Sequence, residues 1–240
     1  MNETQKQPPL KTNPSVPNAA GVEVTFYTDP LCCWSWAMVP AWNRLVSEYG
    51  PGLTVSYKMG GLLPSWKHFE DGTHSISRPA QMGPEWMHAA HLSGVEINSK
   101  LWIADPPASS YPACIAVKCV QLQSEKYAET FLHLLWKAVM VAGKNIARNE
   151  VLLDAAWLLH DEHRDFDLFR FRDDLMGETG KEAFRKDLQE AKYLGITRFP
   201  TLVIKRKDGS TVMLTGYQTS GSLNTGIGMP DQPLSGLPLS

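Results

Sequence analysis

The chain has 240 residues, 43% of which are hydrophobic, and its formal net charge is -2 at pH 7. This length and composition suffice for one large domain, or for a domain that carries an insertion. The net charge is slightly negative, whereas nucleic-acid-binding proteins usually have an excess of basic residues. No apolar run approaches the ~20 residues that cross a bilayer. We therefore expect neither nucleic acid nor a membrane as a partner.

The chain begins with a polar, proline-rich stretch and contains four cysteines in all. Because residues 1–21 lack the apolar segment of a secretory signal, we expect a flexible arm on a cytoplasmic protein. Four cysteines are too few for a disulfide framework in a chain of this size, so they should be free thiols unless one has a chemical role. Cys114 and Cys119 lie five apart on a predicted helix, do not share a face, and are expected to pack in the core.

The first part of the chain predicts a strand, a helix and a second strand. Residues 22–28 have an alternating pattern that is rich in β-branched and aromatic side chains, which predicts a strand. After a short turn, the run CCWSWAMVPAWNRLVSEYG carries apolar residues at helical spacing up to Gly50. Pro40 lies inside this helix and is expected to kink it. Residues 53–63 predict the second strand, which runs into a Gly-Gly turn.

The middle of the chain is helical or loop-like, and strands return only near its end. Helices are predicted over residues 78–92, 109–123, 125–142, 149–159, 167–175 and 181–193. Two more strands are predicted over residues 201–206 and 211–216, and the Asp-Gly pair between them is a strong hairpin signal.

This order of elements predicts an α/β fold with one small mixed sheet. A helical domain is inserted between the β-α-β unit and the C-terminal β-hairpin, and the parallel crossover of the β-α-β unit should be right-handed. The expected division is a flexible arm over 1–21, a discontinuous sheet domain over 22–63 and 195–219, a helical insertion over 64–194, and a flexible tail over 220–240.

The stretch TDPLCCWSWA places two cysteines where a strand ends and a helix begins. At that point Cys32 meets unpaired backbone N–H groups and the positive end of the helix dipole, and both favour the thiolate. Ser35 lies one turn further along the same face, so its hydroxyl can donate to the Cys32 sulfur. We therefore predict that Cys32 is a nucleophile whose pKa lies below that of a free cysteine, ~8.5.

The spacing is that of a Cys-x-x-Cys motif in which Ser35 replaces the second thiol. In a dithiol site the second cysteine resolves the mixed disulfide that the first one forms. Here a mixed disulfide on Cys32 must wait for an outside thiol, typically glutathione. Cys33 is a candidate redox residue, although a bond between neighbouring cysteines closes a strained ring. The alternative is that Cys32 and Cys33 are small buried hydrophobic residues.

A second feature is the run GITRFPTLVI, residues 195–204. Proline cannot donate to a strand ladder and forces the preceding residue to be extended. A cis bond between Phe199 and Pro200 would direct the Phe199 backbone toward whatever lies beside the strand, whereas the alternative is a trans proline that opens it. With Cys32, the two residues would form a slot where an extended peptide or glutathione pairs with the Phe199 backbone. Trp34, at the exposed tip of the helix, is expected to contribute to this slot.

Two pairs of histidines have the spacing of one helix face and are candidate metal ligands. His88 and His91 form the run HAAH, and His160 and His163 form the run HDEH. Three or four such ligands could make a zinc site, but nothing in the sequence places the two pairs together. We therefore predict no metal site.

The cysteine motif at the start of the first helix, the late proline before the third strand and the helical insertion resemble the thioredoxin superfamily, and more narrowly the DsbA family. The resemblance covers about residues 22–217. The runs DPLCCWSWA, SSYPACIAVKCVQLQ, NIARNEVLL and FPTLVI look most like cytoplasmic DsbA-like proteins. These include predicted dithiol–disulfide isomerases and the YjbH-type adaptors that hand a transcription factor to a protease.

The resemblance implies a thioredoxin-like fold in which Cys32 is the nucleophile, Ser35 occupies the resolving position and Pro200 is the cis-proline. The serine departs from the dithiol pattern and argues against dithiol oxidase activity. The predicted function is a thiol–disulfide oxidoreductase or isomerase that acts through Cys32 on protein or peptide thiols and disulfides.

No tightly bound cofactor is expected, glutathione is a candidate co-substrate, and the pattern favours no particular oligomeric state. Two alternatives stay open. One is a non-catalytic, YjbH-like protease adaptor. The other is a glutathione transferase or isomerase of the kappa type, although serine rather than cysteine leads the motif in that type.

Overall fold

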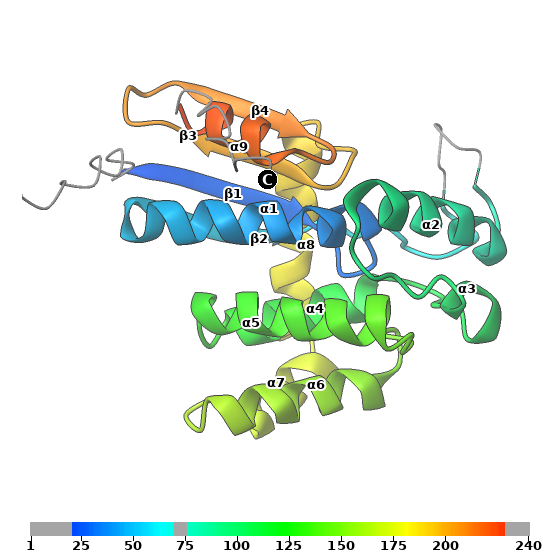
Figure 1. The fold of residues 1–240 in the computed structure, drawn as a ribbon. Helices are drawn as coiled ribbons and strands as arrows, with labels where there is room; N and C mark the ends of the chain where they lie inside the picture. Colours follow the sequence, from blue (N-terminus) through cyan, green and yellow to red (C-terminus); the bar gives the residue numbers. More distant parts are fainter. Residues whose placement is uncertain (1–20, 70–75, 229–240) are drawn as a thin grey trace, which may run out of the picture.

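The computed structural model describes residues 21–69 and 76–228. Its centre is a four-stranded sheet of order β2-β1-β3-β4 (Figure 1). The strands are β1 (Val22–Thr28), β2 (Leu53–Met59), β3 (Thr201–Lys205) and β4 (Thr211–Thr215). β1 and β2 run parallel, and β3 pairs antiparallel with β1 and β4. The β-α-β unit and the hairpin therefore meet in one mixed sheet, which confirms the predicted fold class.

Helix α1 (Cys33–Tyr49) connects β1 to β2 and is continuous through the exposed Pro40. Alternation along the strands decides what each face of the sheet contacts. Phe26 of β1 faces the side covered by α1, where its ring meets the edge of the Trp42 ring at 5.2 Å between centroids. Tyr27 faces the other side and packs against Ala191, near the end of α8 (Thr179–Tyr193).

The remaining helices lie beside and beyond the sheet (Figure 1). They are α2 (Met82–Ser93), α3 (Leu101–Ala104), α4 (Tyr111–Gln121), α5 (Glu125–Trp136), α6 (Asn149–Glu162) and α7 (Leu168–Met176). Short 3-10 turns, η1 (Gly50–Gly52) and η2 (Pro79–Gln81), precede β2 and α2. The helix predicted over 125–142 is α5 followed by a π-helical turn, η3 (Lys137–Val141), and α3 was not predicted.

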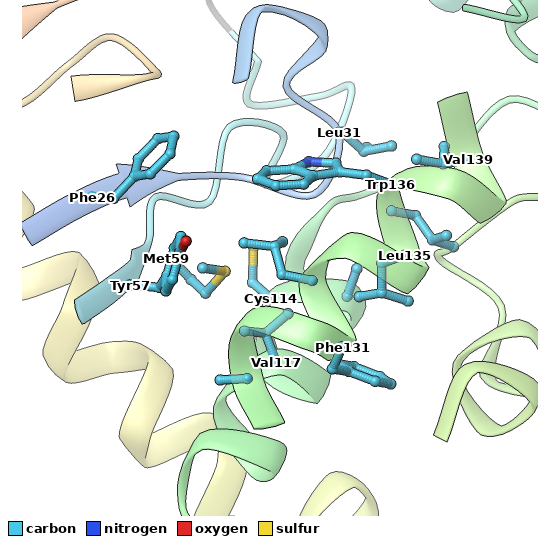
Figure 2. Close-up of a cluster of buried hydrophobic side chains, with 14 of the residues drawn as sticks. Phe26, Leu31, Tyr57, Met59, Cys114, Val117, Phe131, Leu135, Trp136 and Val139 are labelled. Atoms are coloured by element: carbon cyan, nitrogen blue, oxygen red, sulfur yellow. The ribbon is translucent and has the colours of Figure 1, made fainter. Parts of the chain in front are cut away.

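Sheet and helices share one hydrophobic core. Figure 2 shows side chains of the strands, such as Met59, opposite Val117 of α4 and Leu135 of α5, and all three are almost wholly buried. Trp136 lies in the same cluster, and its Nε1–H donates to the Asp29 carbonyl at 3.4 Å. The division into a sheet domain and an insertion over 64–194 stays a prediction.

The predicted flexible tail is wrong for its first residues. Residues Ser220–Gly226 form helix α9, whose first turn is capped because the Thr219 hydroxyl accepts from the Ser222 N–H. Leu223 is fully buried, and a Cβ on Gly226 would come 2.6 Å from the side chain of Leu214. The Gly- and Ser-rich composition suggested disorder, but one buried leucine and close packing on β4 hold the segment. Residues 1–20 and 229–240 of the predicted arm and tail lie outside the described residues.

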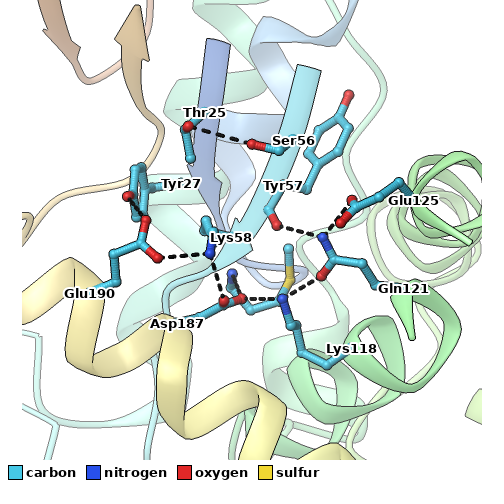
Figure 3. Close-up of polar contacts among 11 residues, drawn as sticks. Thr25, Tyr27, Ser56, Tyr57, Lys58, Lys118, Gln121, Glu125, Asp187 and Glu190 are labelled. Atoms are coloured by element: carbon cyan, nitrogen blue, oxygen red, sulfur yellow. Dashed lines mark hydrogen bonds and ion pairs between the residues drawn. The ribbon is translucent and has the colours of Figure 1, made fainter. Parts of the chain in front are cut away.

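A charged network attaches α8 to the sheet and to α4 (Figure 3). Asp187, 1% exposed, accepts from the Met59 N–H at 2.9 Å and lies 2.7 Å from the Lys118 ammonium. Lys58 lies 3.5 Å from Asp187 and 2.7 Å from Glu190. These contacts fix the end of β2, from which one wall of the cleft described below begins.

Candidate active site

Cys32 lies where the sequence predicts it, at the N-terminus of α1. It is the N-cap residue, with extended backbone angles, and its own N–H donates to the Asp29 carbonyl at 2.9 Å. Its Sγ accepts from the Ser35 backbone N–H at 3.4 Å and donates to the Phe199 carbonyl at 3.3 Å. The sulfur is thus held between a helix terminus and a loop that lies 167 residues further along the chain.

The prediction of an acidic thiol is wrong. Only 4% of Cys32 is exposed, and burial raises the pKa of its thiol to about 11. The Ser35 N–H and the nearby Ser35 hydroxyl act in the opposite direction, while the negative charge of Asp29 raises the pKa further. Loss of water around the thiolate outweighs the helix terminus. At neutral pH the thiol keeps its proton, which points to the Phe199 carbonyl.

This geometry predicts how alkylation of Cys32 depends on pH. Because the thiolate is the reactive form, the rate with iodoacetamide should rise about tenfold per pH unit above pH 7 and level off only near pH 11. The measurement is mass spectrometry of the Cys32 peptide over a pH series, with Cys32→Ser as the control. A plateau below pH 8.5 would show that the thiol is activated after all.

The Ser35 hydroxyl lies beside the Cys32 sulfur and favours its thiolate, as the sequence predicts, but its geometry falls short of a hydrogen bond. The Ser35 Oγ is fully buried and has no hydrogen-bond partner, whereas the Ser35 backbone N–H contacts the Cys32 sulfur. A thiol sulfur is a weak acceptor, and this one already accepts from a backbone donor. The Ser35 hydroxyl therefore remains available to a thiolate at Cys32.

Phe199 and Pro200 have the predicted geometry. The bond between them is cis, and the Phe199 carbonyl touches the Cys32 thiol. The Pro200 carbonyl accepts from the Gly216 N–H at 2.7 Å, which anchors the loop to the end of β4. The predicted cis bond and its place against Cys32 are confirmed, and the roles of the two residues in substrate binding stay predictions.

Trp34 forms part of the rim of the site. Its indole N–H donates to a Glu85 carboxylate oxygen of α2 at 2.5 Å, and its ring meets the edge of the His88 ring at 5.3 Å between centroids. On the other side its ring lies 5.9 Å from that of Tyr217, which follows β4. Trp34 is half-buried and held by three contacts rather than projecting freely. Tyr217 was not predicted.

A cleft of about 940 Å³ opens beside Cys32. Its walls come from the tip of α1, the residues after β2, helix α2, the loop before β3 and the residues after β4. The apolar lining includes Leu31, Leu62, Phe69, Ile76, Met82 and Leu92. Charged side chains are also present, with Glu85 on one wall and Arg198 on the loop before β3. Cys33 lines the same cleft, is a free thiol, and has its pKa raised by burial.

The family model described as Thioredoxin matches residues 26–223. The chain belongs to the thioredoxin family. Among solved structures of the same fold, a protein from Nitrosomonas europaea classed with the disulfide isomerases superposes with a TM-score of 0.69 at 22% identity, over 85% of this chain and 94% of that one. The cytosolic disulfide reductase DsbM from Pseudomonas aeruginosa gives a TM-score of 0.63 at 22% identity, over 80% and 88%. These likenesses confirm the predicted thioredoxin-like, DsbA-type fold.

The curated relatives of this thioredoxin-family chain are ClpXP adapter proteins named SpxH. The relative from Halalkalibacterium halodurans is 24% identical over 198 residues, which cover 82% of this chain and 63% of the relative. The relative from Bacillus subtilis is 27% identical over 183 residues, which cover 75% and 57%. The chain therefore spans about three fifths of the length of these relatives.

Asp29 is a buried residue of this thioredoxin-family site that sequence reasoning treated only as part of a turn. Its carboxylate is fully buried and accepts from the Leu31 N–H at 2.8 Å, the Leu62 N–H at 2.6 Å, the Ser110 hydroxyl at 2.8 Å and the Cys114 thiol at 3.2 Å. Burial raises the pKa of the carboxyl, and these hydrogen bonds oppose the shift. Asp29 thereby ties the turn before α1 to the residues after β2 and to α4.

His88 and His91 lie on α2, whereas His160 lies on α6 and His163 directly follows that helix. Within residues 21–69 and 76–228, no three histidine, cysteine or acidic side chains are arranged to hold a metal ion. In the same ranges, no helix combines the length and the apolar character needed to cross a membrane.

Proposed function

We propose that the protein is a thiol–disulfide oxidoreductase that acts through the single nucleophile Cys32, in the cytoplasm. The observation that carries the proposal is the placement of the Cys32 sulfur. It lies at a helix N-terminus, 3.3 Å from the carbonyl that precedes a cis-proline, on the wall of a cleft large enough for a peptide or for glutathione.

The chemistry is a balanced exchange of sulfur–sulfur bonds. The Cys32 thiolate attacks one sulfur of a substrate disulfide, a new bond forms to Cys32, and the other sulfur leaves as a thiolate that takes up a proton. An outside thiolate then attacks the mixed disulfide, and Cys32 leaves. For each bond that forms one breaks, so no oxidant other than the disulfide is needed. N–H groups at the start of α1 would stabilise the departing Cys32 thiolate.

Glutathione is the outside thiol that we propose. Ser35 cannot form a disulfide, so the protein depends on a second thiol from solution. A structure of DsbM from Pseudomonas aeruginosa with GSH superposes on this chain with a TM-score of 0.59, at 22% identity.

A second candidate function is that of an adaptor. The SpxH relatives match most of this chain, 82% of it for the relative from Halalkalibacterium halodurans. In this case the cleft would grip an extended segment of a partner, without turnover. An isomerase also uses this fold, since a 2-hydroxychromene-2-carboxylate isomerase superposes with a TM-score of 0.57 at 18% identity. The third candidate is the glutathione transferase or isomerase of the kappa type. It is less well supported, because Cys32 rather than serine leads the motif.

One pair of variants separates enzyme from adaptor. As an enzyme, the wild type should use glutathione to reduce a glutathionylated peptide, Cys32→Ala should abolish turnover, and Cys33→Ala should keep it. As an adaptor, the protein should retain a protein partner equally well as wild type and as Cys32→Ala. Turnover that survives in Cys32→Ala would remove the proposal of a Cys32 nucleophile.

A further inference from the structure

A glycine after β2 makes an unusually close approach to the loop before the cis-proline. Gly60 continues the pairing of β1 and β2, because its N–H donates to the Thr28 carbonyl at 2.7 Å. A Cβ on Gly60 would lie 2.1 Å from Cζ and 2.2 Å from Cε1 of the Phe199 ring. The ring therefore rests directly on the Gly60 backbone.

The position requires glycine for space rather than for backbone freedom. Gly61, the next residue, has φ of +65°, a conformation that other residues rarely adopt, but Gly60 has no positive φ. Its φ lies outside the left-handed region, so the obstacle to a side chain at this position is the Phe199 ring. Because the Gly60 N–H is fixed in the sheet pairing, an added methyl group would have to displace the Phe199 ring.

The Phe199 ring and the Phe199 carbonyl belong to one constrained unit. The carbonyl precedes the cis bond to Pro200, and the Pro200 carbonyl is itself fixed by the Gly216 N–H at 2.7 Å. A ring displaced from Gly60 either turns about its own side-chain torsions or moves the Phe199 backbone, and with it the adjacent carbonyl. That carbonyl is the acceptor of the Cys32 thiol, at 3.3 Å.

We propose that Gly60 is a positioning residue for Cys32: it seats the Phe199 ring, and so sets the distance between the nucleophile and the cis-proline loop. The consequence for exchange rests on the proposed function. An added methyl group should pull the carbonyl away from the thiol and admit water to the sulfur, and both changes favour the thiolate. The same displacement would distort the slot in which a substrate backbone meets Phe199.

The test is Gly60→Ala, with the pH dependence of Cys32 alkylation and the rate of exchange with oxidised glutathione as two readouts. The apparent pKa of Cys32 should fall by about one unit, which is roughly a tenfold gain in thiolate at pH 8. The rate of exchange with oxidised glutathione, expressed relative to the alkylation rate to allow for the changed thiolate fraction, should fall several-fold. Gly83→Ala on α2 is the matched control, since a Cβ there meets nothing within 4 Å, and both readouts should stay unchanged.

A double-variant cycle shows whether the effect passes through the ring. In a Phe199→Ala background the ring is absent, so adding Gly60→Ala should change neither readout further. An equal shift in both backgrounds would overturn the proposal. Should Gly60→Ala fail to fold alone, the double variant must fold, and its failure would also overturn the proposal. Alkylation of Cys32 requires no catalytic turnover. The alkylation measurement therefore tests the role of Gly60 even if the protein does not exchange with glutathione.

Discussion

Oxidised glutathione should add one glutathione to Cys32, as a stable adduct that excess thiol removes. In a dithiol site an internal thiol would release the adduct at a high effective concentration. The Ser35 hydroxyl stays protonated and cannot form a disulfide, so the adduct should accumulate. Because burial raises the pKa of Cys32 to about 11, the reaction should be slow at pH 7 and faster at pH 9. Intact mass spectrometry measures the adduct directly.

Three variants make this prediction specific. Cys32→Ser should abolish the adduct, and Ser35→Cys should convert it into an internal disulfide. Cys33→Ser should leave it unchanged, because a bond between neighbouring cysteines is strained. A wild type that instead yields an internal disulfide, lost in Cys33→Ser, would make the adjacent pair the redox site and show that the role given to Ser35 is wrong.

Replacement of Asp187 by asparagine should lower the free energy of unfolding by about 3–5 kcal/mol. Asp187 is 1% exposed and faces Lys118, which is 7% exposed, at 2.7 Å. Without the carboxylate, the buried ammonium loses the negative charge that compensates it, and an asparagine cannot accept from both lysines and the Met59 N–H as well. Urea denaturation measures the loss.

The matched control is an ion pair on the surface. Glu23 and Lys205 lie 3.8 Å apart with both side chains 65% exposed, so Glu23→Gln should cost at most ~1 kcal/mol. Removing both buried charges, in Asp187→Leu with Lys118→Met, should restore much of the stability that Asp187→Asn loses. A cost for Asp187→Asn no larger than that of Glu23→Gln would mean that water already reaches the network.

Local pattern was sufficient to place the chemistry-bearing groups. The change from strand to helical spacing put Cys32 at a helix start, and the proline before a strand pattern indicated the cis bond at Phe199. Composition was misleading at Leu223, because one buried side chain outweighs its glycine- and serine-rich neighbours. Prediction from local pattern therefore held where neighbours in the sequence decide the structure.

The errors concern properties that depend on distant residues. The pKa of Cys32 depends on how deeply its sulfur is buried. That burial depends in part on the loop around Phe199, which is far from Cys32 in the sequence. The partnership of Trp34 with Glu85 spans 51 residues. The sequence predicts Gly60 only as part of a Gly-Gly turn. Its contact with the Phe199 ring, 139 residues further along the chain, cannot be predicted from neighbouring residues.

The hydrogen bond from the Cys32 thiol to the Phe199 carbonyl couples two equilibria. A ligand whose N–H pairs with that carbonyl competes with the thiol proton for the same lone pairs, so ligand binding and loss of the proton assist each other by the same free energy. Affinity for such a ligand should therefore increase as the pH rises through the pKa of Cys32. A bound ligand should lower that pKa in turn, so a thiol that reacts slowly in the empty protein should become more nucleophilic once its partner is in place.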